Sequence, residues 1–288
     1  MISFRHHVVS LVAVLLALAA GVALGGGPLS ELARDPATAS AAASGQRQEA
    51  QREVSFGDDF AAAGAATLYD GRLADQTVSI LTLPGADKDV VTGLAAQVER
   101  AGGAVAGTYD AQPVLVDASE KSLVDTMGTQ LMTTLGGGAV SADASTYPRI
   151  GELLGLAIAA PTESTADATA VRQSLAGADL LSSPAAARRA PLVLVVLGDD
   201  LDDAILSGLL TGLAAKADGV VVAGDAASGI DGDLHALRGE PVADNVATVD
   251  GVDSVVGQVS AVLALARSLK TPGGSYGASG SDGAVPLG

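Results

Sequence analysis

The feature that most constrains this chain is an uncharged run near its start. Residues 8–30 contain no charged side chain, and the apolar part, 8–24, is interrupted only weakly, by Ser10 and Gly21. At about 1.5 Å of rise per residue, a helix of this length reaches across a hydrocarbon core of about 30 Å. No second run of comparable length follows. The sequence therefore predicts one membrane helix, at residues 8–27, that carries a water-soluble domain.

Two interpretations of this run stay open. A cleaved signal peptide would use Ala17-Leu18-Ala19 as its small-x-small site. An uncleaved anchor explains why the apolar run continues past Ala19 to Leu24, and we favour it. Arg5 before the run and the acidic residues after it favour a cytoplasmic N-terminus, residues 1–7, and an exported C-terminal domain.

The same run contains one oligomerisation signal. Gly21 and Gly25 form a Gly-x-x-x-Gly spacing that allows two membrane helices to pair. This spacing arises often by chance in a segment rich in Ala and Gly. It indicates a homo-oligomer only weakly.

Composition excludes several classes of protein. The net charge of −17 argues against binding to nucleic acid, and against docking on anionic lipid through a basic face. The absence of cysteine excludes disulfides, Cys-ligated zinc, iron–sulfur clusters and thiol catalysis. Aromatic residues make up only 2% of the chain, so the core must be built from Val, Leu, Ile and Ala, which is typical of helices packed on a parallel sheet.

Residues 28–66 are expected to form a stalk or linker. Pro36 and Gly45 interrupt this segment, while residues 46–54 favour a helix without an apolar stripe. Because apolar a and d positions are absent, a tether or short helical stalk is favoured over a coiled coil.

Residues 67–271 alternate strand and helix patterns. Strands are predicted at 77–83, 104–109, 191–197, 219–223 and 246–249, and helices at 87–101, 119–135, 150–159, 166–176, 201–216 and 253–269. Ser119 is the expected cap of the second helix, and residues 225–239 are expected to form a loop. The alternation predicts a three-layer α/β domain with a mainly parallel sheet. The Gly/Ser-rich residues 272–288 are expected to be a mobile tail.

The strongest candidate site is an acidic cluster, Asp199, Asp200, Asp202 and Asp203. It lies where a predicted parallel strand ends, which is where open α/β sheets bind ligands, and its carboxylates are suited to Mg²⁺ or Ca²⁺. An enzyme that uses a hard metal here is one hypothesis. Helix capping by Asp200 explains the same residues, and we favour it.

Other candidate groups are sparse. His235 is flanked by Asp231 and Asp233 but has no Gly-x-Ser-x-Gly partner motif, so it is expected to be a solvated loop histidine. Tyr276 is expected to be an exposed aromatic residue. The glycines at 102–103 and 136–138 end predicted helices and do not form phosphate loops. The sequence thus predicts no catalytic or cofactor-binding residue, and a protein that is not an enzyme.

Several segments resemble a known family. Residues 1–11, 21–25, 78–84, 101–105, 151–158, 249–253 and 274–277 read MISFRHHVVSL, GVALG, VSILTLP, AGGAV, GELLGLAI, VDGVD and GSYG. Together, and in this order, they resemble the MctB family of actinobacterial copper transporters. The resemblance implies a single-pass, envelope-associated protein that takes part in copper efflux, with copper as the transported ion and a proposed pore.

The residue inventory offers few copper ligands. After the membrane helix the chain has no Cys, and its soft or imidazole ligands are Met127, Met132 and His235. Met127 lies in a predicted apolar stripe, so packing explains it better than ligation. The sequence assigns no residue as a metal ligand.

Two functional hypotheses follow. The first follows the resemblance and describes an envelope-anchored protein that supports copper efflux or tolerance. The second describes a bitopic scaffold whose exported α/β domain binds and regulates a cell-envelope partner such as a cell-wall hydrolase. Both place the globular domain outside the cytoplasm and connect it to a membrane.

Overall fold

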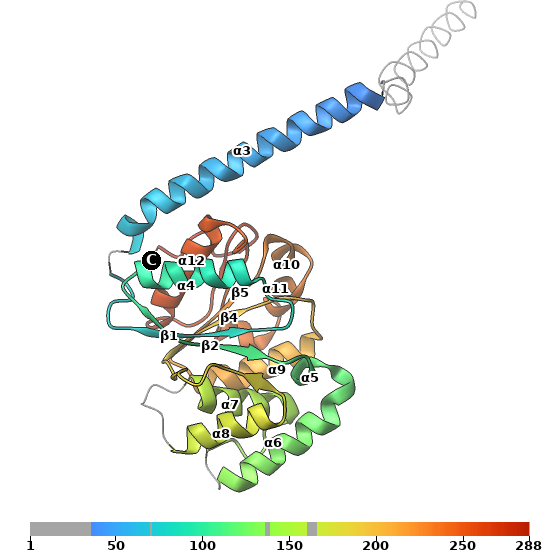
Figure 1. Cartoon of the computed structure of the whole chain (residues 1–288), viewed down its shortest axis with the longest axis vertical. Helices are drawn as coiled ribbons and strands as arrows, with labels where there is room; N and C mark the ends of the chain where they lie inside the picture. The colour runs from blue at the N-terminus through green and yellow to red at the C-terminus, as the bar shows by residue number, and fades with distance from the viewer. Residues whose placement is uncertain (1–35, 70, 136–138, 160–165, 288) are drawn as a thin grey trace, which may run out of the picture. The chain divides into compact units, whose positions relative to one another are not determined.

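The computed structural model describes residues 36–69, 71–135, 139–159 and 166–287 (Figure 1). The chain divides into two compact units, Met1–Phe56 and Gly57–Gly288. The predicted membrane helix, the residues before it and the Gly21 and Gly25 pair all lie outside the described residues. Within the described ranges, no helix combines the length and the hydropathy that a membrane span requires.

One seven-stranded sheet forms the centre of the second unit. Its strand order is β3-β2-β1-β4-β5-β6-β7, and only the β2–β3 pair is antiparallel. The strands are β1 (Thr77–Thr82), β2 (Ala104–Ala111), β3 (Leu181–Ser182), β4 (Leu192–Val196), β5 (Gly219–Ala223), β6 (Ala247–Val249) and β7 (Ser275–Tyr276). The prediction of a mainly parallel sheet is confirmed.

Helices cover both faces of this sheet (Figure 1). One face carries α4 (Lys88–Arg100) and α12 (Val255–Ser268), and the other carries α6 (Lys121–Leu135), α7 (Thr146–Ile158), α8 (Ala166–Gly177) and α9 (Asp203–Ala214). Along β4, Leu194 belongs to the hydrophobic cluster of the first face, and its neighbours Val193 and Val195 belong to that of the second. A strand buried on both faces must be apolar at every position, which explains the continuous apolar run there.

The order β2-β1-β4-β5 creates a switch point between β1 and β4, where the chain winds to opposite sides of its starting strand. The two loops that leave these strands pack closely. A side chain at Gly198 would collide with the Pro84 carbonyl, and Gly85 has a positive φ of 81°. A small crevice of about 100 Å³, which Asp87, Asp225 and Asp253 help to line, lies at this end of the sheet.

The segment before the sheet is one continuous helix, α3 (Pro36–Tyr69), so the predicted interruption at Gly45 is wrong. Ala61, Ala65 and Tyr69 are spaced four residues apart and are buried in the cluster formed with α4 and α12. Small alanines supply this apolar stripe, which is why the sequence did not show it. The compact unit begins at Gly57 rather than near residue 67.

Two side chains bind the end of α3 to its neighbours. The Asp58 carboxylate accepts a hydrogen bond of 2.8 Å from the backbone N–H of Val255, at the N-terminus of α12. The Tyr69 hydroxyl donates a bond of 2.9 Å to Oε1 of Gln97 on α4. These contacts fix the last turns of α3 within the compact unit.

The C-terminal segment is part of the sheet, contrary to the prediction of a mobile tail. Ser275 and Tyr276 form β7, which pairs with β6, and Tyr276 is only 3% exposed. Gly273, Gly274 and Gly277 all adopt positive φ, which non-glycine residues rarely adopt. The glycines that suggested mobility instead shape the turns around this short strand.

Several other predictions need correction. The expected loop at 225–239 contains two five-residue helices, α10 (Ala226–Ile230) and α11 (Asp233–Leu237), which are too short to show a helical period. Two further short elements, α5 (Pro113–Val116) and η1 (Ala118–Glu120), precede α6, and Asp117 rather than Ser119 provides the cap there. The apolar residues Leu123 on α6 and Val256 on α12 lie outside the core, at 43% and 39% exposed. Helix α7 begins at Thr146, before the predicted residue 150.

Candidate functional site

The acidic cluster after β4 is a capping structure. All four carboxylates, of Asp199, Asp200, Asp202 and Asp203, belong to exposed residues. Asp202 accepts hydrogen bonds from the backbone N–H groups of Ala204 and Ile205, at 3.0 and 3.2 Å, and so caps α9. The capping interpretation is therefore confirmed, with Asp202 in the position that the sequence assigned to Asp200.

Neighbouring acids at this end of the sheet act in the same way. Asp87 caps α4, Asp225 caps α10, and Asp253 accepts a hydrogen bond of 3.2 Å from the Ala226 N–H. No group of three or more His, Cys, Asp or Glu in the described ranges is arranged to hold a metal ion. Asp199, Asp200, Asp202 and Asp203 therefore do not form the ligand set that the hard-metal hypothesis requires.

Asp233 is an exception among these acids because it is buried, with 6% of its surface exposed. Its carboxylate accepts one hydrogen bond, of 3.2 Å, from the backbone N–H of Leu201. Burial raises the pKa of this carboxyl group, and the negative charges of Asp200 and Asp203 raise it further. Asp233 is therefore protonated more readily than an exposed aspartate.

The three candidate copper ligands lie on two different helices, α6 and α11. Met127 and Met132 lie on α6, partly buried against the hydrophobic cluster of that face, so the packing interpretation of Met127 is confirmed. His235 is exposed, as predicted, but lies on α11 rather than in a loop. In the part of the chain that the structure describes, His235 belongs to no group of three or more His, Cys, Asp or Glu that could hold a metal ion.

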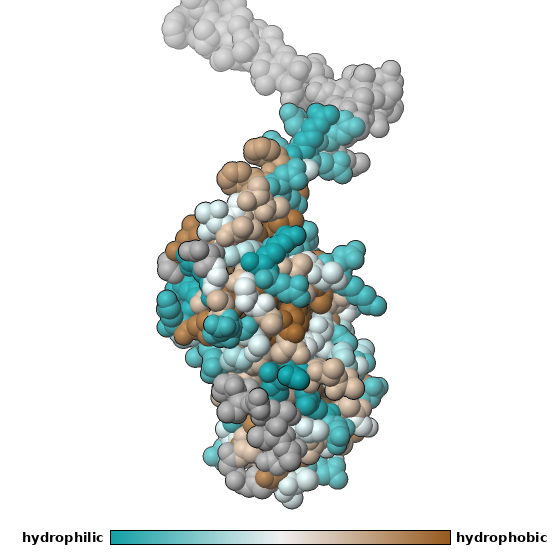
Figure 2. Space-filling model, turned by 60° about the vertical axis from the view of Figure 1, so that its left-hand side comes forward, coloured by the Kyte–Doolittle hydropathy of each residue, from teal (hydrophilic) through white to brown (hydrophobic). Residues whose placement is uncertain are grey.

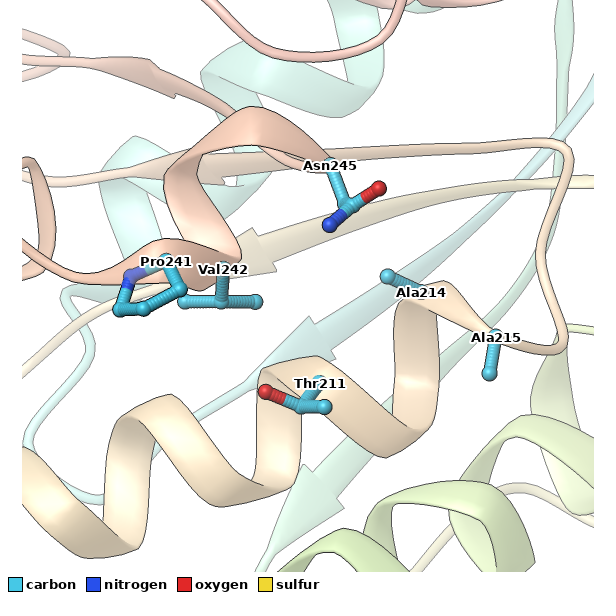
Figure 3. A pocket seen from close by; sticks show the side chains of 6 residues that line it. All are labelled: Thr211, Ala214, Ala215, Pro241, Val242 and Asn245. Atoms are coloured by element: carbon cyan, nitrogen blue, oxygen red, sulfur yellow. The ribbon is translucent and has the colours of Figure 1, made fainter.

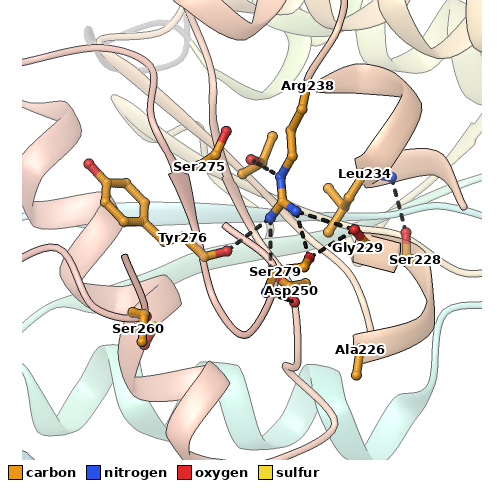
Figure 4. Close-up of polar contacts among 12 residues, drawn as sticks. Ala226, Ser228, Gly229, Leu234, Arg238, Asp250, Ser260, Ser275, Tyr276 and Ser279 are labelled. Atoms are coloured by element: carbon orange, nitrogen blue, oxygen red, sulfur yellow. Dashed lines mark hydrogen bonds and ion pairs between the residues drawn. The ribbon is translucent and has the colours of Figure 1, made fainter. Parts of the chain in front are cut away.

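A buried ion pair, which the sequence did not reveal, lies at the β6–β7 edge of the sheet (Figure 4). Nη2 of Arg238 lies 2.8 Å from Oδ1 of Asp250, and the Asp250 side chain is completely buried. The same Nη2 donates to the Tyr276 carbonyl at 2.9 Å, and Nε donates to Oγ1 of Thr248 at 3.0 Å. Arg238 thus joins α11, β6 and β7.

The second Asp250 oxygen is also occupied, because Oδ2 accepts a hydrogen bond of 3.0 Å from the Ser279 N–H. Nη1 of Arg238 donates to the Ser279 hydroxyl at 2.8 Å. With both carboxylate oxygens and all three guanidinium nitrogens bonded, the network stabilises the C-terminal segment and offers no obvious place for a ligand. The sequence signals for this network were the motifs that contain Asp250 and Tyr276.

Two hollows lie along α9. The smaller, of about 300 Å³, lies between the C-terminal half of α9 and the short helix η2 (Pro241–Asp244), and no ionisable group lines it (Figure 3). The larger, of about 700 Å³, lies along the N-terminal half of α9 and is lined by Lys121, Tyr147, Asp203 and Glu240 among others. Thr211 lines both hollows.

Comparison with known proteins gives the family. The family model described as "Copper transport outer membrane protein, MctB" matches residues 1–287. This chain belongs to the MctB family. It is similar to the copper transporter MctB of Mycobacterium bovis and to that of Mycobacterium tuberculosis, with 29% identity over 92% of this chain and 92% of each relative. The resemblance found in the sequence motifs is confirmed.

Two of the motifs that carry the MctB resemblance meet in the structure. The segment 249–253 supplies Asp250, and the segment 274–277 supplies Tyr276, whose carbonyl binds Arg238. These two motifs are therefore explained by the packing of the C-terminal segment.

Proposed function

We propose that this chain is an envelope-anchored protein that supports copper efflux or tolerance. The observation that carries the proposal is the match to the MctB family over residues 1–287, which includes the predicted membrane segment as well as the α/β unit. In this proposal residues 8–27 anchor the chain, the N-terminus is cytoplasmic, and the α/β unit is extracytoplasmic. Copper is the cargo, and the protein is not an enzyme.

A deletion strain tests this function. We expect loss of the gene to lower the copper concentration that the cells tolerate and to raise intracellular copper, and we expect the full-length gene to restore both. Zinc tolerance, measured in parallel, controls for general damage to the envelope. Unchanged copper tolerance and unchanged intracellular copper in the deletion strain would refute the proposal.

The topology can be tested separately. A reporter that is active only outside the cytoplasm is fused after residue 288 and, as a matched control, after residue 7. We expect activity from the first fusion alone. Activity from the second fusion alone would place the α/β unit in the cytoplasm and exclude both functional hypotheses.

A pore is the finer form of this proposal. One chain supplies one predicted membrane helix, so a pore requires several copies. We expect the full-length chain in detergent to have a mass of several protomers by light scattering with the detergent contribution subtracted. A strictly monomeric chain that still restores copper tolerance would exclude the pore and leave the copper function intact.

A scaffold function is the second candidate, and exposed aromatic residues on α3 favour it. Phe56 and Phe60 are each 73% exposed, whereas all four tyrosines are at least nine-tenths buried. Figure 2 shows hydrophobic side chains gathered along part of this helix. Exposed hydrophobic side chains that cluster are typical of protein interaction surfaces. Affinity purification of the full-length chain should recover an envelope protein. The Phe60→Ala variant should recover less of that protein. Equal recovery by the two chains would count against this candidate.

A further inference from the structure

The last turns of α3 expose an uncharged stripe on the face opposite to the one that they bury. Ala61, Ala65 and Tyr69 form the buried face, which packs in the cluster with α4 and α12. At about 3.6 residues per turn, the other side of residues 56–67 carries six uncharged residues, which we call the α3 stripe. They are Phe56, Gly57, Phe60, Ala63, Gly64 and Thr67. This part of α3 therefore carries uncharged residues on two opposite faces.

The two phenylalanines of the α3 stripe are the most exposed of the large hydrophobic residues that the structure describes. Phe56 and Phe60 lie four residues apart on one face of the helix, and each is 73% exposed. Clustered aromatic rings in solvent are typical of an interaction surface, and a helix that is apolar on several sides is usually covered on all of them. We therefore expect a second body to cover the α3 stripe.

The glycines of the α3 stripe are not explained by packing within the chain. Around Gly57 and Gly64, a Cβ atom would have no neighbour within 4 Å outside the local helix backbone, and neither glycine has a positive φ. Glycine in the middle of a helix lowers its stability, so such a residue usually has a packing reason. Small residues beside exposed rings allow another helix to approach closely.

The α3 stripe is complementary to itself. Its two phenyl rings project, and the small residues Gly57, Ala63 and Gly64 beside them leave recesses next to those rings. A two-fold pair uses the same surface twice, so the projections of one copy meet the recesses of the other. A second copy of this chain thus supplies both the rings and the recesses.

Charge argues against a lipid surface and limits the length of the contact. Glu49 and Glu53 are exposed and continue the same face of α3 towards its N-terminus, on a chain of net charge −17. Anionic lipid attracts basic residues and repels these acids. Two copies side by side in the same direction along all of α3 would bring their Glu53 carboxylates together. The contact is therefore confined to residues 56–67, where the two helices cross.

We propose that the α3 stripe is the contact between two copies of this chain, with the helices crossing near Phe60 and the phenyl rings of each copy packed over the small residues of the other. About three turns of helix bury less than the roughly 800 Å² per partner of a standard stable interface. The pair therefore depends on copies being concentrated in one membrane, and in this respect it rests on the anchor of the proposed function. The scaffold candidate assigns the same surface to a different protein.

Cross-linking of single-cysteine variants tests the pair. The chain has no cysteine, so an introduced thiol is its only one. The full-length Ala63→Cys chain, in the membranes of the cells that make it, is treated with a short membrane-permeant bis-maleimide. We expect a product with the mass of two protomers. The matched control Ala66→Cys is also exposed but lies off the α3 stripe, and should give no such product.

Two further substitutions, each added to Ala63→Cys, connect the product to the rings and to the recesses. Phe60→Ala removes a ring from both copies and should weaken the pair at least about tenfold. Gly64→Leu fills a recess and should also abolish most of the product, whereas Gly45→Leu, outside the α3 stripe, should not. Both leucines enter open space in a single chain, so each variant should melt at or above the temperature of the Ala63→Cys chain.

Three results would overturn the proposal. Equal yields from Ala63→Cys and Ala66→Cys would show random collision. A two-protomer product that survives both Phe60→Ala and Gly64→Leu would place the contact elsewhere, for example at Gly21 and Gly25. A product that contains a different envelope protein in place of the second copy would favour the scaffold candidate. None of these results bears on the copper proposal, which is tested by the tolerance of the deletion strain.

Discussion

Asp250 and Asp233 are two buried carboxylates of the same compact unit, but their surroundings differ. They are 1% and 6% exposed. Asp250 is bonded through one oxygen to Arg238 and through the other to a backbone N–H. Asp233 has one backbone N–H as its partner and lies near the negative charges of Asp200 and Asp203. Burial alone therefore does not say whether a carboxylate stabilises this fold. The groups that replace water around the carboxylate decide whether it stabilises the fold.

Removing the partner of Asp250 should have the largest effect. Arg238→Met leaves a buried carboxylate without its cation, so we expect the free energy of unfolding to fall by about 3–5 kcal/mol. Urea denaturation of the full-length chain measures this change. Arg72→Met, at an exposed position, is the control and should change stability by less than about 0.5 kcal/mol. A cost for Arg238→Met no larger than that of the control would show that the ion pair does not stabilise the C-terminal segment.

Removing Asp202, an exposed acid that accepts hydrogen bonds from backbone N–H groups, should have an intermediate effect on stability. Asp202→Ala removes the cap of α9 and should cost about 1 kcal/mol in the free energy of unfolding. The matched variant Asp200→Ala, two residues earlier, leaves this cap in place and should cost less than about 0.5 kcal/mol. Thermal denaturation of the two variants compares them directly. Equal costs would contradict the assignment of the cap to Asp202.

Removing the charge of Asp233 should raise the free energy of unfolding, whereas removing the cation that pairs with Asp250 should lower it. Its folded-state pKa is raised, so its contribution to stability is most favourable at low pH and is lost as the pH rises through the folded-state pKa. Asp233→Asn keeps an oxygen for the Leu201 N–H and removes the charge. We expect this variant to be more stable than the wild type by up to about 1 kcal/mol at pH 7.

The pH dependence of the Asp233→Asn effect distinguishes removal of the charge from a simple packing change. The advantage of Asp233→Asn should shrink as the pH falls from 7 towards about 4, near the unperturbed aspartate pKa. Urea denaturation at several pH values measures the difference. An advantage that stays constant over this range would show that the Asp233 charge is not its source.

The smallest effect is expected at Asp199, which is exposed and is not the cap of α9. Asp199→Asn should change the free energy of unfolding by no more than about 0.5 kcal/mol, and the variant gene should restore copper tolerance to a deletion strain as fully as the wild type does. Plating on graded copper measures the second outcome. Loss of tolerance in a stable Asp199→Asn protein would make the acidic cluster a functional site again.

The central part of the fold is predictable from sequence because its strands carry their own signal. The apolar run that becomes β4 is continuous, and the buried leucines and isoleucine of α9, the helix that follows, recur at helical spacing. Strand β7 has only two residues and forms by pairing with β6, so no local pattern predicts that Tyr276 lies in a strand. The resemblance to the MctB family was likewise readable from ordered motifs.

The sites were harder to predict because tertiary packing creates them. Arg238 belongs to a region without periodicity, and its partners Asp250 and Ser279 come from other segments. Lys121, Tyr147 and Glu240 are far apart in the chain and meet only when α6, α7 and η2 pack around α9. Only the acidic cluster after β4 could be located in advance, and the structure uses one of its members, Asp202, as a helix cap.

The burial of the last turns of α3 sets where the chain can be cut. A fragment that starts at residue 70 would lack Ala61, Ala65 and Tyr69, and would leave hydrophobic surface of α4 and α12 uncovered. It would also lose the Asp58 carboxylate that closes the first turn of α12. A truncation intended to yield a well-behaved soluble product must therefore retain Gly57 and everything after it, including the glycine-rich C-terminus that pairs with β6.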